Sequence, residues 1–469
     1  MAPSRSGVVR NRSKGEQQMA GRGRAQAHRV GTHRAGGMTR RRLQATLGAA
    51  AGGAAAACGP LGRSEVRPSQ GRQVTLTWLA SRGAVEVPVW EGMARAFEQQ
   101  HPNFKVDYVN STEGWAAKLP ALMAADSGPD IVRVEANGFA DLIAKGFIKD
   151  LSSYVQRDAA FSPRDFIAQS LEAFKYDGKQ YAIPMVFSSI VMNYNTRLFQ
   201  EAGVAPPAEG WTWSDYADAA RRLTRKTGDK PIWGTGWETT LLLRVVPFVW
   251  QNGGELFDKA YSRARFDLGS ATDALEWLVD MRYKSGVSPT AQELTGTNVH
   301  NLFLSQQLAM TPIGPWQRAL YNSTKELPWD VAPLPKGKQS DTTANFAGGY
   351  PITTQSRSPD DAWVLIRFLT GDESSRTWAR LGISAPARRA AALSDAFVAE
   401  AGPPKNAKAY VTYPERSSAP SPDFVGFADV NRVIEEELAP MWRGEAAPRA
   451  AATSVAARVN ELLAQYAKR

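Results

Sequence analysis

The order in which strand-like and helix-like segments follow one another limits the fold of this chain more than any other feature. Between residues 74 and 151, apolar runs with strand character alternate with segments whose apolar residues recur at helical spacing. The expected strands are 74–79, 105–109 and 130–134, and the expected helices are 89–100, 115–125 and 138–145. Strands that alternate with helices pair in parallel and are covered on both faces, so we expect an α/β protein. In such sheets ligands bind beyond the carboxyl ends of the strands.

The rest of the chain continues the alternation, without an internal repeat. Strands are expected at 181–184 and 189–193, and helices at 212–223, 272–284, 359–369, 432–441 and 451–467. Thr212 and Asp215 have the spacing of a capping box, which predicts the start of one helix. A chain of 469 residues that is 43% apolar can bury enough surface for two globular lobes.

The positive charge of the chain is concentrated at its amino end. Of 56 basic and 46 acidic residues, eleven basic and one acidic lie in 1–57, which leaves 45 of each in 58–469. A nucleic-acid-binding domain needs a surplus of Lys and Arg on its fold, so the neutral body argues against that partner. The single cysteine, Cys58, excludes a disulfide framework and Cys-rich metal sites, and only His101 and His300 lie in the body. We therefore expect no metal and no other cofactor.

Residues 38–57 are organised like an export signal. Three arginines, Arg40 to Arg42, precede thirteen residues that are nearly all Ala and Gly, and Cys58 follows. As a helix these thirteen residues would reach about 20 Å, which is short of the ~30 Å hydrocarbon core of a membrane. The arginines resemble the twin-arginine motif, and Ala55-Ala56-Ala57-Cys58 resembles the lipobox of lipoproteins, in which the cysteine is acylated.

An acylated Cys58 would hold the protein at the outer face of the cytoplasmic membrane, in the periplasm if an outer membrane exists. Residues 58–72 are rich in Pro, Gly and Ser and are expected to form a flexible tether. Within the leader, 1–57, residues 1–37 lack apolar periodicity and are rich in Arg, Gly and Ser. They are interpreted either as a disordered nucleic-acid-binding arm or, preferably, as the product of an upstream start codon, with Met38 as the true start.

Seven segments of the body resemble, in the same order, those of a known family. They are 97–106, 118–132, 142–151, 178–195, 252–256, 310–316 and 348–352, and they include Gly128-Pro129-Asp130 and Gly314-Pro315-Trp316. The family is that of the extracellular solute-binding proteins of carbohydrate ABC importers, of the maltose- and glycerol-phosphate-binding type. The resemblance covers about residues 73–443.

The resemblance implies a two-lobed periplasmic-binding-protein fold, type II-like, with solute held between lobes that close about a hinge of three crossings. It assigns residues 73–182 and 331–373 to lobe one and residues 183–330 and 374–469 to lobe two. It also implies a carbohydrate ligand and the permease subunits of an ABC importer as partners. A monomer without enzymatic activity is expected.

A sugar has flat apolar C–H faces and hydroxyl edges, so its site needs aromatic side chains with hydrogen-bonding groups around them. By the resemblance, Trp316 corresponds to a tryptophan that stacks on the sugar, and Glu135 and Asn137 stand where the family has polar sugar contacts. The other candidates lie near the ends of expected strands or in loops: Ser81, Arg82, Glu113, Trp115, Trp237, Glu238 and Tyr350. Packing in the core or a solvated loop is the alternative for each. Five further tryptophans are expected to pack in the core: Trp90, Trp250, Trp277, Trp363 and Trp378.

Three alternatives remain open at this point. Arg82 or Arg388 would suit a glycerol phosphate, a glycerophosphodiester or an acidic sugar instead of a neutral one. An exported glycan-active enzyme is the rival class, because two carboxylates brought together by folding leave no sequence motif. A binding protein that reports to a membrane sensor, and not to an importer, is the third.

Overall fold

The structure is a computed structural model, and it describes residues 65–69, 71–80, 83, 86–112, 114–227, 230–239 and 242–467, except the side chains of Leu243 and Arg244. The chain divides into two units, Met1–Gly59 and Pro60–Arg469, and every described residue lies in the second. The export signal, Cys58, Ser81, Arg82 and Glu113 lie outside the described residues. In the described part of the chain, no helix has both the length and the apolar character of a membrane span.

Lobe one is built on the predicted alternation of strands and helices. Its three-stranded sheet has the order β2-β1-β3, and both pairings are parallel. The strands are β1 (Val74–Ala80), β2 (Phe104–Asn110) and β3 (Ile131–Val132), and the helices between and after them are α1 (Val87–Gln100), α2 (Trp115–Ala124) and α3 (Phe139–Ala144). Trp78 lies between Tyr108 and Ile131 in the sheet, fully buried and stacked on Trp90 of α1 at 5.3 Å between ring centroids. The α/β prediction is confirmed for this lobe.

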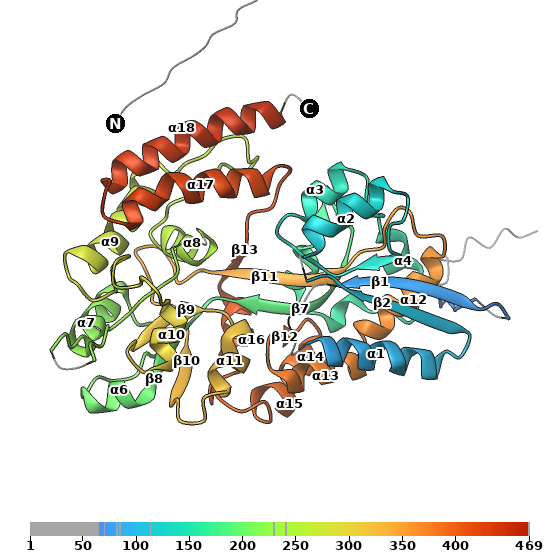
Figure 1. Cartoon of the computed structure of the whole chain (residues 1–469), viewed down its shortest axis with the longest axis horizontal. Coiled ribbons are helices and arrows are strands. Elements are labelled where there is room, and N and C mark those ends of the chain that lie inside the picture. Colours follow the sequence, from blue (N-terminus) through green and yellow to red (C-terminus); the bar gives the residue numbers. More distant parts are fainter. Residues whose placement is uncertain are drawn as a thin grey trace, which may run out of the picture. The chain divides into compact units, whose positions relative to one another are not determined.

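A second sheet connects lobe one with lobe two. Its order is β12-β7-β11-β13, and β4 also pairs with β11. The strands are β4 (Val134–Glu135), β7 (Ile183–Ser189), β11 (Thr343–Tyr350), β12 (Ala385–Pro386) and β13 (Ser418–Pro420). Ile183 and Tyr350 pack in the core of lobe one, whereas Phe187 and Ala344 pack in the core of lobe two. Strands β7 and β11 therefore pass from one core to the other, along the middle of the molecule (Figure 1).

Lobe two contains a three-stranded sheet of order β10-β8-β9, and here both pairings are antiparallel. Its strands are β8 (Val191–Asn195), β9 (Met310–Ile313) and β10 (Trp329–Ala332). Its helices are α6 (Thr196–Glu201), α7 (Trp213–Leu223), α8 (Leu242–Gln251), α9 (Gly269–Tyr283), α10 (Val299–Leu304), the 3-10 turn η2 (Pro315–Gln317), α11 (Arg318–Asn322), α16 (Ala409–Arg416), α17 (Phe427–Trp442) and α18 (Pro448–Tyr466). The expectation of a mostly parallel sheet is wrong for this lobe. Apolar periodicity marks a strand but not its direction, which depends on where the chain enters the sheet.

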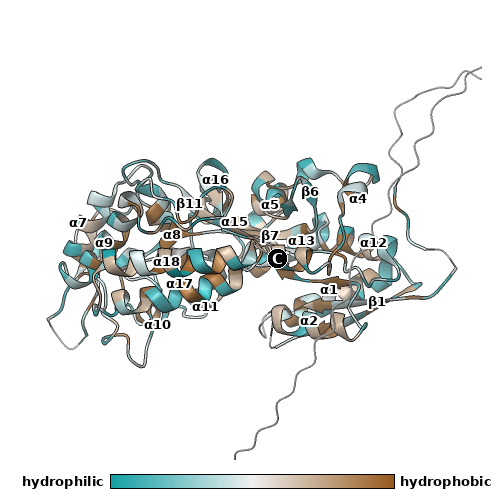
Figure 2. Ribbon diagram, turned by 90° about the horizontal axis from the view of Figure 1, so that it is seen from above, coloured by the Kyte–Doolittle hydropathy of each residue, from teal (hydrophilic) through white to brown (hydrophobic). Residues whose placement is uncertain are grey.

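The remaining elements complete the two cores. They are α4 (Ser152–Arg157), η1 (Pro163–Asp165), α5 (Ala168–Glu172), β5 (Lys175–Tyr176), β6 (Lys179–Gln180), α12 (Pro359–Leu369), α13 (Asp372–Leu381), α14 (Arg389–Ala392) and α15 (Asp395–Val398). Figure 2 shows hydrophilic and hydrophobic bands along α17 and α18, as expected of helices with one buried face. Val430 and Ile434 of α17 and Val455 and Val459 of α18 are fully buried.

The predicted helix at 359–369 and the Thr212–Asp215 capping box are both confirmed. Of the five tryptophans expected in the core, Trp90, Trp363 and Trp378 are buried, while Trp250 and Trp277 are half-buried and pack against the core of lobe two.

Part of the segment expected to be a flexible tether is bound to lobe one. The backbone N–H of Ser69 donates to Asp361 Oδ1 and its hydroxyl donates to Asp361 Oδ2, both at 2.9 Å. Arg367 Nη2 donates to the carbonyl of Val66 at 2.9 Å. Composition predicts flexibility only for a segment without partners, and helix α12 supplies these partners. The tether prediction is therefore wrong for residues 65–69.

Candidate functional site

The residues of the candidate site line a crevice between lobe one and the strands that leave it. Ala136, Asn137 and Ala173 form one wall. The other wall is formed by residues of β11, of the end of β13 and of the segment after it, namely Asn345, Phe346, Pro420, Ser421 and Asp423. The cavity between them is about 20 Å³, which is roughly the room that one water molecule needs. The crevice combines an aromatic ring with amide, hydroxyl and carboxyl groups, the kinds of group that bind a polyol, but a sugar needs its two walls farther apart than in this structure.

Trp316 lies beside this crevice. It belongs to η2, directly after Gly314-Pro315, and its half-buried ring meets Phe346 edge-to-face, with centroids 5.8 Å apart at 88°. A Cβ on Gly314 would lie 2.0 Å from Cζ3 of the indole, so only glycine allows the ring to fold back over the backbone at this point. The Gly-Pro-Trp sequence therefore fixes where the indole lies, next to an aromatic residue of the crevice.

Glu135 lies at the end of β4, next to the crevice residue Ala136. It forms an ion pair with Arg133, whose side chain is 2% exposed while that of Glu135 is 36% exposed. Strand β4 pairs with β11 at Gly348, and a Cβ there would lie 2.4 Å from Nη2 of Arg133. Glycine at 348 therefore makes room for a buried guanidinium beneath the site. Sequence analysis missed Arg133, although a charged residue inside an apolar strand is a signal that could have found it.

Asn137 and Trp115 are two further predicted residues on lobe one. Asn137 lines the crevice. Trp115 is the first residue of α2, half-buried against a small apolar cluster of lobe one. The carboxyl ends of β1 and β2 meet in front of α2, where Asn110 pairs with Ala80 and the N–H of Ser111 donates to the carbonyl of Ala80 at 2.7 Å.

Two predicted ligand contacts are core residues in this structure. Tyr350 has no exposed surface, and its ring packs against that of Trp78 at 5.8 Å. Trp237 is 1% exposed, and the guanidinium of Arg282 lies over its ring at 5.2 Å. The loop assigned to Trp237 is a buried segment, because the N–H of Gly236 donates to the carbonyl of Met310 at 3.1 Å. In this structure both aromatic residues therefore pack in the core and do not line the crevice.

Glu238, the neighbour of Trp237, is engaged inside lobe two. Its Oε1 lies 2.5 Å from Nε2 of His300, and Nδ1 of His300 lies 2.9 Å from the hydroxyl of Tyr321. His300 is buried, whereas the side chain of Glu238 is 23% exposed. The carboxylate is therefore held by the imidazole and only partly exposed. Neither Glu238 nor its partners are among the residues that line the crevice.

Asp423 is a crevice residue that sequence analysis did not find. Its two carboxylate oxygens accept the backbone N–H groups of Gly138 and Ala140, at 2.5 and 3.0 Å. Burial raises the pKa of Asp423 to about 7. The two backbone hydrogen bonds lower the pKa, and the negative charge of Asp141 raises it, but both effects are smaller than that of burial. Because its partners are distant in sequence, no local pattern could have predicted this role.

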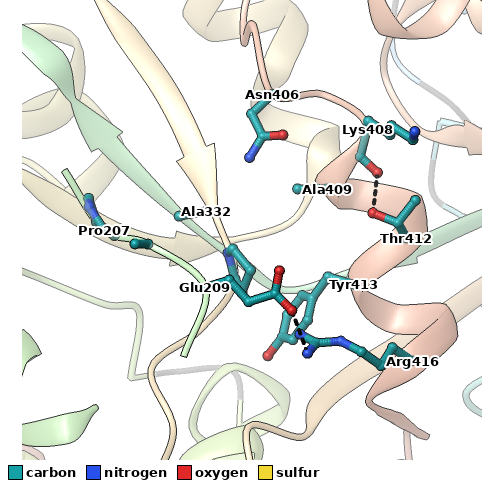
Figure 3. A pocket seen from close by; sticks show the side chains of 11 residues that line it. Pro207, Glu209, Ala332, Asn406, Lys408, Ala409, Thr412, Tyr413 and Arg416 are labelled. Atoms are coloured by element: carbon teal, nitrogen blue, oxygen red, sulfur yellow. Dashed lines mark hydrogen bonds and ion pairs between the residues drawn. The ribbon is translucent and has the colours of Figure 1, made fainter. Parts of the chain in front are cut away.

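A separate pocket lies on lobe two, between α16 and the end of β10 (Figure 3). Arg416 forms an ion pair with Glu209 at 2.7 Å across it, and the hydroxyl of Thr412 donates to the carbonyl of Lys408 at 3.3 Å. None of the predicted ligand residues lines this pocket. In the residues that the structure describes, there is also no group of three or more His, Cys, Asp or Glu placed to hold a metal ion.

The fold and the crevice between its two cores define a two-lobed binding protein, and comparison with known proteins gives the family. The model of the family described as bacterial extracellular solute-binding protein matches residues 83–375. The chain therefore belongs to this family of solute-binding proteins.

Known structures and curated relatives agree with this assignment. An ABC substrate-binding protein of Listeria monocytogenes, in complex with cycloalternan, superposes with a TM-score of 0.74 at 26% identity, over 83% of this chain and 99% of that one. The sugar-binding protein MalE of Xanthomonas citri gives a TM-score of 0.73 at 21% identity, over 84% and 98%. The sn-glycerol-3-phosphate-binding periplasmic protein UgpB of Escherichia coli is 22% identical over 415 residues, which cover 83% of this chain and 92% of UgpB. The predicted two-lobed fold and family are confirmed, and these relatives are binding proteins and not enzymes.

Proposed function

We propose that this protein captures a sugar or oligosaccharide outside the cytoplasmic membrane and delivers it to an ABC importer when its lobes close on it. The observation that carries the proposal is the pairing of Trp316 with Phe346 beside a crevice that also holds Asn137 and Ser421. The two rings offer an apolar surface to the C–H face of a sugar, and the amide and hydroxyl groups can bind its hydroxyls.

Relatives support a carbohydrate ligand. The Listeria neighbour is described in complex with cycloalternan, and the Xanthomonas neighbour as a sugar-binding protein. We propose that this chain also binds a carbohydrate, and we do not name which one. Glu135 and Trp115, at the carboxyl ends of the lobe-one strands, are proposed as further contacts, together with Ser81, Arg82 and Glu113. Glu238 is proposed as a contact from lobe two.

A phosphate-bearing ligand such as glycerol phosphate is the second candidate, because UgpB is among the relatives. Two arginines that could favour an anion are already paired. Arg133 is bound to Glu135, and Arg388 lies 3.0 Å from Asp165 and 3.2 Å from Asp372. A buried cation that already has a carboxylate partner adds little attraction for a second anion. The pairing of Arg133 and Arg388 favours a neutral sugar, while Arg82, the other arginine that would suit an anion, lies outside the described residues.

The anchor and the partners complete the proposal. We propose that Cys58 is acylated and holds a monomer at the outer face of the cytoplasmic membrane, where the closed form meets the permease subunits. Ligand drives closure by binding the closed form more tightly than the open one.

The test is a thermal-shift screen of neutral sugars and glycerol phosphates, since a ligand that binds only the folded state raises the melting temperature. We expect a neutral mono- or oligosaccharide to give the largest shift. The same sugar should bind Trp316→Ala about tenfold or more weakly, which corresponds to ~1.4 kcal/mol. The matched control is Trp213→Ala, a half-buried tryptophan of the same lobe whose ring contacts Phe248 and Trp277 and not a crevice residue. A shift with glycerol phosphates alone would support the second candidate, and release of sugar products would contradict both.

A further inference from the structure

Two helices from different lobes have amino ends that lie beside each other next to the crevice. They are α3 of lobe one and α17 of lobe two. Each begins after a glycine in the left-handed region, Gly138 at φ 89° and Gly426 at φ 85°, and neither has a side-chain cap of its own. The first N–H groups of a helix have no partner within the helix, so a glycine cap leaves them to be satisfied from elsewhere.

Each helix receives its cap from the other. Asp423, just before α17, accepts the N–H groups of Gly138 and Ala140 at 2.5 and 3.0 Å. Asp141, on the first turn of α3, accepts the N–H of Gly426 at 2.8 Å. We call these three hydrogen bonds the reciprocal cap. The arrangement places an acidic side chain from the opposite lobe at the amino end of each helix.

The reciprocal cap joins the two cores. Phe139 and Leu142 of α3 pack in an apolar cluster of lobe one. Phe424 and Phe427 pack in the core of lobe two, where Phe424 stacks on Tyr261 at 4.8 Å. The residue after Asp423, Phe424, therefore fixes the backbone in lobe two, while the side chain of Asp423 binds lobe one. Opening of the lobes at this side must break all three hydrogen bonds.

We propose that the reciprocal cap is a clasp that stabilises the closed arrangement of the lobes, and that Asp423 is the positioning residue for Asn137 in the crevice. Asn137 directly precedes Gly138, so the hydrogen bond from Gly138 to Asp423 fixes the backbone that carries the Asn137 amide. This inference rests on the proposed function, because it requires lobes that open and close around a ligand.

The clasp is tested first without ligand, so that its failure can be told apart from failure of the proposed sugar. Gln99 on α1 and Gln465 on α18 are exposed and lie on different lobes. Both are replaced by cysteine for spin labelling, in the full chain with Cys58→Ser, and the distance between labels is measured by pulsed electron spin resonance. We expect Asp423→Ala and Asp141→Ala to shift the distribution toward longer distances. Identical distributions in the parent and both variants would overturn the proposal.

The matched control is Asp429→Ala. Asp429 is an exposed residue of α17 that accepts a hydrogen bond from Tyr466 within lobe two, so its loss should leave the distances unchanged. The positioning role is tested with the sugar found in the thermal-shift screen. Asp423→Ala should raise its Kd about tenfold or more, because two backbone donors lose their acceptor on closure. Asp423→Asn, which keeps one acceptor oxygen, should restore most of the affinity. Equal affinities of Asp423→Ala and the parent would overturn the positioning role.

Discussion

Closure of the lobes should be coupled to the uptake of a proton by Asp423. In this structure burial raises the pKa of Asp423 from its ordinary value of 3.8 to about 7. The charge of Asp141 of α3 also raises its pKa. Tyr176 and Tyr261 lie near Asp423 as well, since burial, and to a smaller extent the charge of Asp423, raise the pKa of both hydroxyls. If the lobes open, Asp423 returns to water and its pKa falls toward the ordinary value.

The direction of the pH effect follows from the sign of this shift. A carboxyl group whose pKa is raised in the closed state favours that state when it is protonated, so its contribution is present at low pH and is lost as pH rises through about 7. Each pH unit between the two pKa values changes the closure equilibrium by up to about tenfold. We therefore expect the ligand to bind about ten- to a hundredfold more tightly at pH 5 than at pH 8.

The assay is isothermal titration of the sugar across this pH range, with the parent and with Asp423→Asn. The amide does not titrate, so the dependence should be lost in that variant, while the control Asp429→Asn should keep it. A pH profile that is flat in the parent, or equally steep in Asp423→Asn, would refute the reasoning.

Four other substitutions have definite expected results. Gly234→Ala would place Cβ 2.0 Å from the carbonyl oxygen of Ala220, and should lower the free energy of unfolding by about 2 kcal/mol or more in urea titrations. Gly269→Ala, where a Cβ meets nothing within 4 Å, should be neutral or stabilise by about 0.5 kcal/mol, and a similar loss in both variants would contradict the packing argument. Asp361→Ala removes both hydrogen bonds to Ser69 and should make the 65–69 segment more sensitive to proteolysis than in the parent; equal cleavage rates would count against docking of this segment. Cys58→Ser should release the protein from membranes in fractionation experiments, and its retention there would rule out the lipid anchor.

Local patterns predicted the elements of this fold better than their assembly. The helix at 359–369 and the capping box of Thr212 depend on neighbours within one or two turns, so the sequence around them is sufficient. The antiparallel direction of β8 to β10 depends on how the chain passes through the connecting sheet, and no periodicity records it. The order of seven family-like segments supplied the two-lobed arrangement that periodicity alone does not contain.

The same distinction applies to the site. Trp316 was predictable because Gly314 and Pro315, its neighbours, fix its position. Tyr350 lies at the end of a strand as expected, but its ring packs into the core against Trp78, which belongs to another strand. Asp423 and Gly138 are 285 residues apart, and their hydrogen bond exists only after both lobes have folded. Sequence analysis missed or misplaced the residues whose role depends on contacts with residues distant in the sequence.

Calorimetric titration of this protein with neutral mono- and oligosaccharides, followed by analysis of the recovered sugar, tests the central claim most directly. Capture between hinged lobes predicts one sugar bound per chain, weakened by Trp316→Ala and recovered chemically unchanged. No heat of binding with any neutral sugar, together with saturable binding of glycerol phosphate, would contradict it.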